Sequence, residues 1–206
     1  WEEMTSRHAS IALGDITLST KNGLYKPRKH HGAGTILLRM YNINDASFDL
    51  SREQRLETTA KEAADYAVVD GDIIVSRVNS RELVGKSALV QGLTESAVHE
   101  AMLIRLRVDP QRADRAFLTA LMNSPQFLEN LRSRAKHAIG QSSINQRDLL
   151  SSPVPLPSLS AQTEAMETLN KVWPLVQSSM SEADERTRMV VGLRDAVLRK
   201  AFAGEL

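Results

Sequence analysis

The 206-residue chain contains no cysteine, which excludes disulfides, cysteine nucleophiles and thiolate metal sites. This absence fits a reducing compartment, and we expect the protein in the cytoplasm. The chain has no run of about 18 apolar residues, which predicts that no segment spans a membrane. No secretory signal pattern follows the first residue, Trp1. Because that residue is not methionine, we expect a fragment of a longer protein.

The net charge is only +1, but two stretches lack acidic residues altogether. Residues 16–44 and 130–147 carry Lys, Arg and His without a single Asp or Glu. Basic stretches within a nearly neutral chain indicate a polyanion that is contacted by loops rather than by a whole basic surface. The alternative is that both stretches are ordinary solvated loops.

The first three quarters of the chain predict an α+β domain. Runs rich in Ile, Val and Leu at 35–40, 72–78, 87–90 and 101–108 are typical of strands. Residues 113–123 have helical spacing, and a second helix is expected to begin with Ser124 as its cap and Pro125 at its first position.

A proline-rich segment then separates two regions. Pro153, Pro155 and Pro157 exclude a helix and predict an extended connector, followed by a helix with Ser160 as its N-cap. We therefore predict a domain over 1–152, a connector over 153–159 and a helix over 160–206.

The last region has the pattern of a coiled coil. From Gln162 to Ala201, twelve positions are spaced alternately by four and three residues, and nine of them are apolar. Such a helix needs a partner helix, although it could instead fold back on a large core. Pro174 should kink or split the helix. The apolar positions are Met166, Leu169, Trp173, Val176, Met180, Ala183, Val190, Val197 and Ala201.

No catalytic motif is complete. The glycines at 32 and 34 precede a strand, whereas a methyltransferase cofactor turn follows one, and residues 123–127 are better explained by helix capping. Asp70, Asp72, Glu82 and Lys86 lie near one another without a nuclease spacing, and no histidine pair fits a zinc site. We predict that the chain is not an enzyme and holds neither a metal nor a cofactor.

Several segments, in order along the chain, resemble the specificity subunit of type I restriction-modification enzymes. They are 11–16 (IALGDI), 38–43 (LRMYNI), 71–77 (GDIIVSR) with 84–88 (VGKSA), 140–145 (GQSSIN) with 153–157 (PVPLP), and 193–206 (LRDAVLRKAFAGEL). Members of that family usually carry two such units, and this chain carries one. The resemblance implies a target-recognition domain followed by a spacer helix, present either as half of a subunit or as a single unit that dimerises.

The resemblance also implies double-stranded DNA as ligand, with one half of a split site read by each domain and the spacing set by the coil. It implies methyltransferase subunits, which bind S-adenosylmethionine, and a restriction translocase as partners. A protein-binding coiled-coil adaptor remains an alternative, as does the recognition part of another DNA-modification system. The residues predicted to contact DNA are Lys21, Asn22, Lys26, Arg28, Lys29, His30, Arg77, Asn79, Ser80, Arg81, Lys86, Arg134, Lys136, Gln141 and Ser142.

Overall fold

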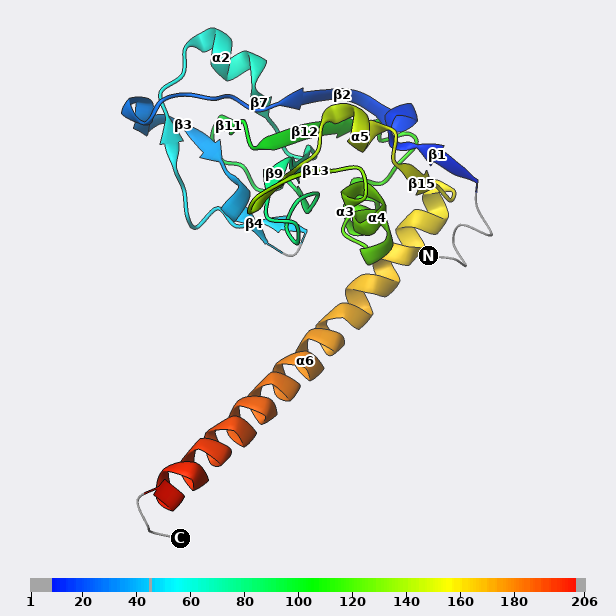
Figure 1. Ribbon diagram of the computed structural model, residues 1–206. Coiled ribbons are helices and arrows are strands. Elements are labelled where there is room, and N and C mark those ends of the chain that lie inside the picture. Colours follow the sequence, from blue (N-terminus) through cyan, green and yellow to red (C-terminus); the bar gives the residue numbers. More distant parts are fainter. Residues whose placement is uncertain (1–8, 45, 203–206) are drawn as a thin grey trace. The chain divides into compact units, whose positions relative to one another are not determined.

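The computed structural model describes residues 9–44 and 46–202, with side chains through residue 189. The chain divides into two units, Trp1–Thr163 and Glu164–Leu206. The first unit mixes short strands and helices, and the second consists of most of one long helix (Figure 1). The predicted α+β class with a long C-terminal helix is confirmed. Trp1 and residues 203–206 lie outside the described residues.

A six-stranded sheet forms the centre of the first unit. Its innermost residues are apolar because central strands are covered on both faces, and Ile73, Ile74 and Val75 are fully buried. β12 pairs antiparallel with β2 and with β8, and β8 pairs antiparallel with β10. In order across the sheet the strands are β2 (Thr17–Asn22), β12 (Leu103–Val108), β8 (Ile73–Ser76), β10 (Ser87–Leu89), β5 (Ser47–Phe48) and β4 (Ile43–Asn44).

A four-stranded sheet packs against the first through a shared apolar cluster. Ile36 and Leu38 from this sheet lie with Ile74 and Leu103 from the central sheet in one buried core. β3 pairs parallel with β11. The strands, in spatial order, are β6 (Arg55–Leu56), β3 (His31–Leu38), β11 (Ala97–His99) and β7 (Ala67–Val68).

Two smaller sheets complete the strand pairing. The three-stranded sheet consists of β13 (Lys136–Ala138), β14 (Gln141–Ser143) and β9 (Val78–Asn79), with β14 in the middle. β1 (Ser10–Ala12) pairs antiparallel with β15 (Pro153–Pro155). Part of the proline-rich segment is thus a strand of the first unit, which continues as far as Thr163.

The helices of the first unit are short and well capped. Ser124 accepts a hydrogen bond from the Phe127 N–H, and Pro125 occupies the first position of α4, as predicted. The helix expected over 113–123 is shorter, because Asp114 is its cap. The elements are α2 (Ala60–Asp65), α3 (Arg115–Met122), α4 (Pro125–Arg132), α5 (Gln146–Leu150) and the 3-10 turns η1 (Leu13–Ile16), η2 (Arg28–His30) and η3 (Met40–Asn42).

The long helix α6 (Leu159–Phe202) departs from two predictions. It begins before Ser160, because the Ser158 side chain accepts from the Ala161 N–H and the Ser158 carbonyl from the Gln162 N–H. It also continues through Pro174 without a split (Figure 1). A proline removes only its own N–H and the bond to the carbonyl four residues earlier, and the remaining bonds of a long helix hold that turn.

Gln162 corrects the predicted start of the heptad pattern. Its side chain is fully buried in the first unit instead of lying on an open seam. Its Oε1 accepts from the Asp114 N–H at 2.7 Å, and its Nε2 donates to the carbonyls of Pro157 at 2.8 Å and Arg112 at 3.3 Å. One amide therefore ties the first turn of α6 to the segment that precedes α3.

Replacing Gln162 with Ala should lower the free energy of unfolding by about 2–4 kcal/mol, because three buried backbone groups lose their partner. Chemical denaturation followed by circular dichroism measures this. Gln91→Ala, at an exposed loop position, is the control and should change stability by less than about 0.5 kcal/mol. Equal stabilities for the two variants would contradict the role of Gln162.

His99, on β11, is a buried histidine that packs between two backbone carbonyls. Its Nδ1 lies 3.2 Å from the Tyr66 carbonyl oxygen and its Nε2 3.1 Å from that of Lys21. Burial lowers the pKa of His99 to about 4 from an ordinary value of 6.5, even though both carbonyls favour the protonated ring. The folded protein therefore holds this imidazole neutral near neutral pH.

The low pKa of His99 predicts that the protein becomes less stable as the pH is lowered. Between pH 6.5 and about 4 the unfolded chain binds a proton that the folded chain does not, so the stability is complete above this window and declines within it. From pH 7 to pH 5 the loss should be about 2 kcal/mol. Denaturation of wild type and His99→Gln at both pH values measures it. If the free energy of unfolding of His99→Gln falls as much between pH 7 and pH 5 as that of wild type, His99 is not the cause of the pH dependence.

Candidate nucleic-acid interface

The three-stranded sheet β13–β14–β9 brings together several of the predicted contact residues. Lys136 is on β13, Gln141 and Ser142 are on β14, and Asn79 is on β9. Ser142 is paired with Asn79, and Gln141 with Ala138. Residues more than 50 positions apart in the sequence thus lie in adjacent register positions.

Internal bonds hold the β13–β14 hairpin in place. His137 Nδ1 and Ser142 Oγ lie 2.9 Å apart across the two strands. Just beyond β14, the Ile144 N–H donates to the Arg77 carbonyl at 3.0 Å, and the Ile144 side chain is buried. Ser142 is itself only 3% exposed, so it supports the hairpin from inside, whereas Lys136 and Gln141 are exposed.

The residues around β9 are partly engaged in shaping the turn. Asn79 Oδ1 accepts from the Ser80 N–H at 2.9 Å, and its Nδ2 donates to Ser76 Oγ at 3.2 Å. An amide has a second N–H and a second lone pair, so Asn79 keeps hydrogen-bonding capacity. Arg77 donates to the Ala101 carbonyl at 3.2 Å.

The loop between β9 and β10 carries Arg81 and Lys86, both exposed. Arg132 of α4 fixes this loop by donating to the Val84 carbonyl at 3.0 Å and the Glu82 carbonyl at 2.6 Å. Arg134 is occupied in a similar way, because it donates to Asn130 Oδ1 at 2.7 Å and Ser151 Oγ at 3.0 Å.

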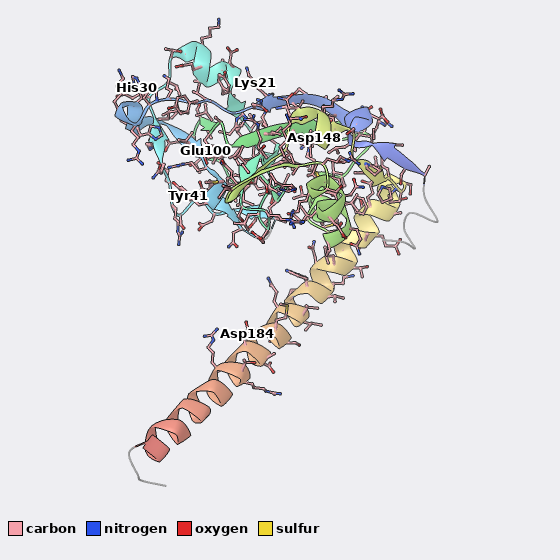
Figure 2. The ribbon with its side chains drawn as sticks, in the orientation of Figure 1. Lys21, His30, Tyr41, Glu100, Asp148 and Asp184 are labelled. Carbon is pink, nitrogen blue, oxygen red and sulfur yellow. The ribbon has the colours of Figure 1, made fainter. Side chains whose placement is uncertain are left out.

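The predicted residues of the first basic stretch divide between two places. Lys21, on β2, lies 4.3 Å from the centre of the Tyr66 ring, and Asn22 accepts from Gln146 Nε2 at 3.0 Å. Arg28 and Lys29 are exposed on η2, a turn that also holds His30. Figure 2 labels Lys21 and His30, the two ends of this set.

Although Lys26 belongs to an acid-free stretch of the sequence, an acidic side chain lies next to it in the fold. Its Nζ donates to Glu62 Oε2 at 2.7 Å and to the Glu57 carbonyl at 2.8 Å. The hydrogen bond from Lys26 lowers the pKa of Glu62 to about 2, with a further contribution from the Thr59 N–H. His30 similarly lies 3.2 Å from Glu57 Oε2. Acids that are distant in the sequence thus neutralise part of this basic stretch.

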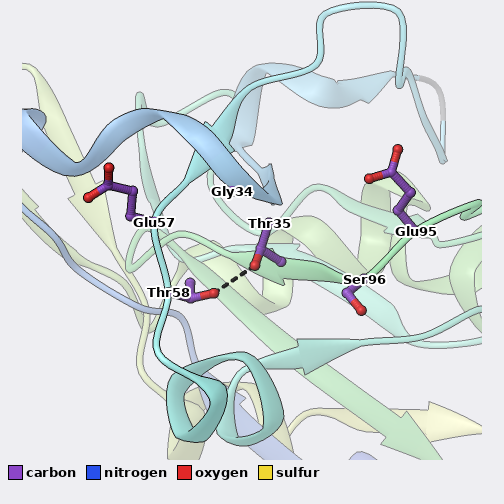
Figure 3. Close-up of a pocket in the computed structure, with 6 residues that line it drawn as sticks. All are labelled: Gly34, Thr35, Glu57, Thr58, Glu95 and Ser96. Atoms are coloured by element: carbon purple, nitrogen blue, oxygen red, sulfur yellow. Dashed lines mark hydrogen bonds between the residues drawn. The ribbon is translucent and has the colours of Figure 1, made fainter.

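A hollow beside these acids is unsuited to phosphate. It is about 440 Å³ in volume and open to solvent (Figure 3). Arg55 pairs with Glu95 at 2.9 and 3.0 Å, and the Thr35 and Thr58 hydroxyls lie 2.6 Å apart. The residues that line the hollow in the described part of the chain include two carboxylates and no lysine or arginine, so the lining offers a phosphate no cation. The hollow is lined by Gly34, Thr35, Glu57, Thr58, Glu95 and Ser96.

The aspartates that the sequence suggested for a nuclease site instead make hydrogen bonds that support the fold. Asp72 is buried and accepts two hydrogen bonds from Arg107, at 2.7 and 3.1 Å. Asp70 accepts from the N–H groups of Gly92 and Leu93. Within the described ranges, no three His, Asp or Glu side chains are grouped to hold a metal ion.

Sequence reasoning did not select two residues of the hairpin, His137 and Ile139. His137 bonds to Ser142, and Ile139 is fully exposed at the tip. Gly140 was the one turn signal in this segment, and nothing in the sequence singled out His137 or Ile139.

The second unit presents apolar side chains along α6. Leu169, Trp173, Val176, Met180 and Ala183, all predicted seam residues, are exposed, and Met166 is half-buried. The side chains of Val190, Val197 and Ala201 lie outside the described residues. In the part of the chain that the structure describes, no helix is both long and apolar enough to cross a membrane.

The sequence was compared with those of known proteins. No protein-family model matches the chain. It is 28% identical over 198 residues to the type I restriction enzyme StySPI specificity subunit of Salmonella potsdam, covering 96% of this chain and 43% of that protein. It is 31% identical over 159 residues to the putative type I restriction enzyme MjaX specificity subunit of Methanocaldococcus jannaschii, covering 77% of this chain and 37% of that protein.

A solved structure agrees with these relatives in fold. The HsdS subunit from Thermoanaerobacter tengcongensis matches with a TM-score of 0.63 at 19% identity, over 96% of this chain and 45% of that one. The chain spans less than half the length of the relatives it matches. It is therefore a relative of the type I restriction enzyme specificity subunits and corresponds to a part of one.

Proposed function

We propose that the chain is a DNA sequence-reading unit of a type I restriction-modification system, in which it recognises one half of a bipartite target. The observation that carries the proposal is the three-stranded sheet, on which Lys136 and Gln141 share one face by strand register and are both exposed, whereas Asn79 lies opposite the buried Ser142 on the other face. Amide side chains can bond adenine through two atoms at once, and a lysine neutralises a phosphate without reading sequence. The sheet thus combines both kinds of contact.

The charge around this sheet supports a polyanionic ligand. No acidic residue occurs between Asn130 and Arg147. Arg81 and Lys86 follow β9 and are exposed, as is Glu82 between them, so the loop next to the sheet adds two cations and one acid. By contrast, Lys26 and His30 face Glu62 and Glu57. We therefore place the main DNA contact at the three-stranded sheet and its neighbouring loop, with Arg28 and Lys29 as secondary phosphate contacts.

The long helix supplies the second part of the proposal. Leu169, Trp173 and Val176 are 39%, 45% and 38% exposed on α6. Apolar residues at this spacing pack into the corresponding side of another helix. The partner is a second copy of this chain or a tandem unit, and the resulting coil holds two recognition units at a fixed separation.

In this proposal the chain performs no chemistry. Methyltransferase subunits bind S-adenosylmethionine and modify the DNA, and a restriction translocase joins the same assembly. The chain supplies only recognition and docking, in accordance with the specificity subunits it resembles.

Lysine and glutamine variants should separate affinity from specificity. A random-sequence duplex library, selected on the full chain, should yield a preferred sequence. Lys136→Ala should weaken binding to all duplexes about equally and reduce the slope of log affinity against log salt by about one. Gln141→Ala should instead remove the preference at one base pair, at a cost of about 1–3 kcal/mol.

Lys26→Ala is the matched control, because its charge is already neutralised by Glu62. It should leave the salt slope nearly unchanged. A wild-type chain that enriches no sequence, or whose binding does not respond to salt, would contradict the proposed function.

The apolar seam of α6 can be tested by placing a charge on it. Leu169→Asp should bury an unpaired carboxylate between helices, cost about 3–5 kcal/mol and abolish association of two chains or units. Sedimentation measures the association. Leu175→Asp, on a 70% exposed side chain outside the seam, is the control and should associate like wild type. Association that persists in Leu169→Asp would exclude the seam as the interface.

A further inference from the structure

The tip of the β13–β14 hairpin carries an apolar side chain that the fold does not use. Ile139 lies between Ala138 and Gly140 and is fully exposed. A single exposed apolar residue is common on protein surfaces, so what Ile139 can contact is decided by the polar and basic side chains next to it. The neighbouring positions are occupied by Lys136, His137 and Gln141, all of them exposed.

The backbone holds Ile139 outward. Ala138 and Gln141 are paired, so Ile139 and Gly140 are the two turn residues. The positive φ of +72° falls on Gly140 and not on Ile139, which is the sign pattern of a type II turn, where glycine is favoured at this position. Hydrogen bonding between His137 and Ser142 and pairing of β14 with β9 fix the strands behind the turn.

We propose that Ile139 is a specificity-determining residue, which contacts the methyl group of a thymine in the major groove of double-stranded DNA. The inference rests on the proposed function and deepens it. Lys136 gives this hairpin a positive charge that attracts a polyanion, and among the base edges of duplex DNA the thymine methyl is the apolar group of the major groove.

The dimensions of the hairpin fit this groove. Two paired strands lie about 4.8 Å apart, and the major groove is about 12 Å wide, enough for a two-stranded ribbon, whereas the minor groove is about 6 Å wide. Gln141 lies directly across the turn from Ala138. A glutamine that bonds adenine and an isoleucine that touches a thymine methyl both select A·T pairs, so the tip is a reader of A·T-containing sequence.

The test uses the preferred duplex selected by the full wild-type chain, with each thymine in turn replaced by deoxyuridine, which lacks only the methyl group. For wild type, one such replacement should weaken binding about fourfold, the effect of one buried methyl group. Ile139→Ala should bind the thymine duplex about as weakly as wild type binds that deoxyuridine duplex. In the variant, the replacement at the same position should have no further effect.

Leu18→Ala is the matched control, because Leu18 is 67% exposed on β2. It should keep the wild-type response to deoxyuridine. Thermal unfolding of Ile139→Ala should match wild type, since the side chain makes no buried contact at the tip.

Two results would overturn the inference while leaving the proposed function intact. In the first, Ile139→Ala retains the full response to deoxyuridine. In the second, it weakens binding to every duplex equally while wild type ignores deoxyuridine, which would make Ile139 a wedge between bases and not a methyl reader. A wild-type chain that selects no sequence from the library would instead refute the proposed function itself.

Discussion

The structure depends on the complete burial of β8. Ile73, Ile74 and Val75 have no exposed surface, and the strand pairs on one side with β12 and on the other with β10. Every backbone group of such a strand must be bonded within the fold, so its register is fixed. β9 follows β8 after a single residue, Arg77, and inherits that fixed position. The hairpin that pairs with β9 is therefore attached directly to a fully buried strand of the core, although its own β13 strand and tip are exposed.

Much of the fold could be predicted because the signals were local. The runs of Ile, Val and Leu identified β8, β10 and β12, and the Ser124-Pro125 pair identified the start of α4. The boundaries that were wrong depended on contacts between distant residues. Ser160 looked like a helix cap, but Ser158 takes that role. Gln162 continued a heptad pattern in the sequence, yet its amide satisfies Asp114, Arg112 and Pro157.

The candidate site was less predictable, because the local charge and the exposure of a side chain depend on residues that are distant in the sequence but close in the fold. An acid-free stretch around Lys26 indicated a phosphate contact, whereas the fold supplies Glu62 from a position 36 residues later. Ser142 had the right chemistry for a base contact but points inward. The residues that remain exposed together, Lys136 and Gln141, were predicted one by one, and only strand pairing shows that they share a sheet with Asn79. The predicted contact residues stay predictions until DNA binding is measured.

The pairing of β1 with β15 has a consequence for how such units are combined. Ser10 lies opposite Pro155, and Ala12 opposite Pro153, so the chain enters and leaves the strand-rich body at adjacent points. A body with adjacent attachment points can be inserted, duplicated or exchanged as a cassette, because the flanking segments meet the same geometry whatever lies between them. Under the proposed function, replacing the residues between these two strands would change the target sequence without redesigning the helix that follows.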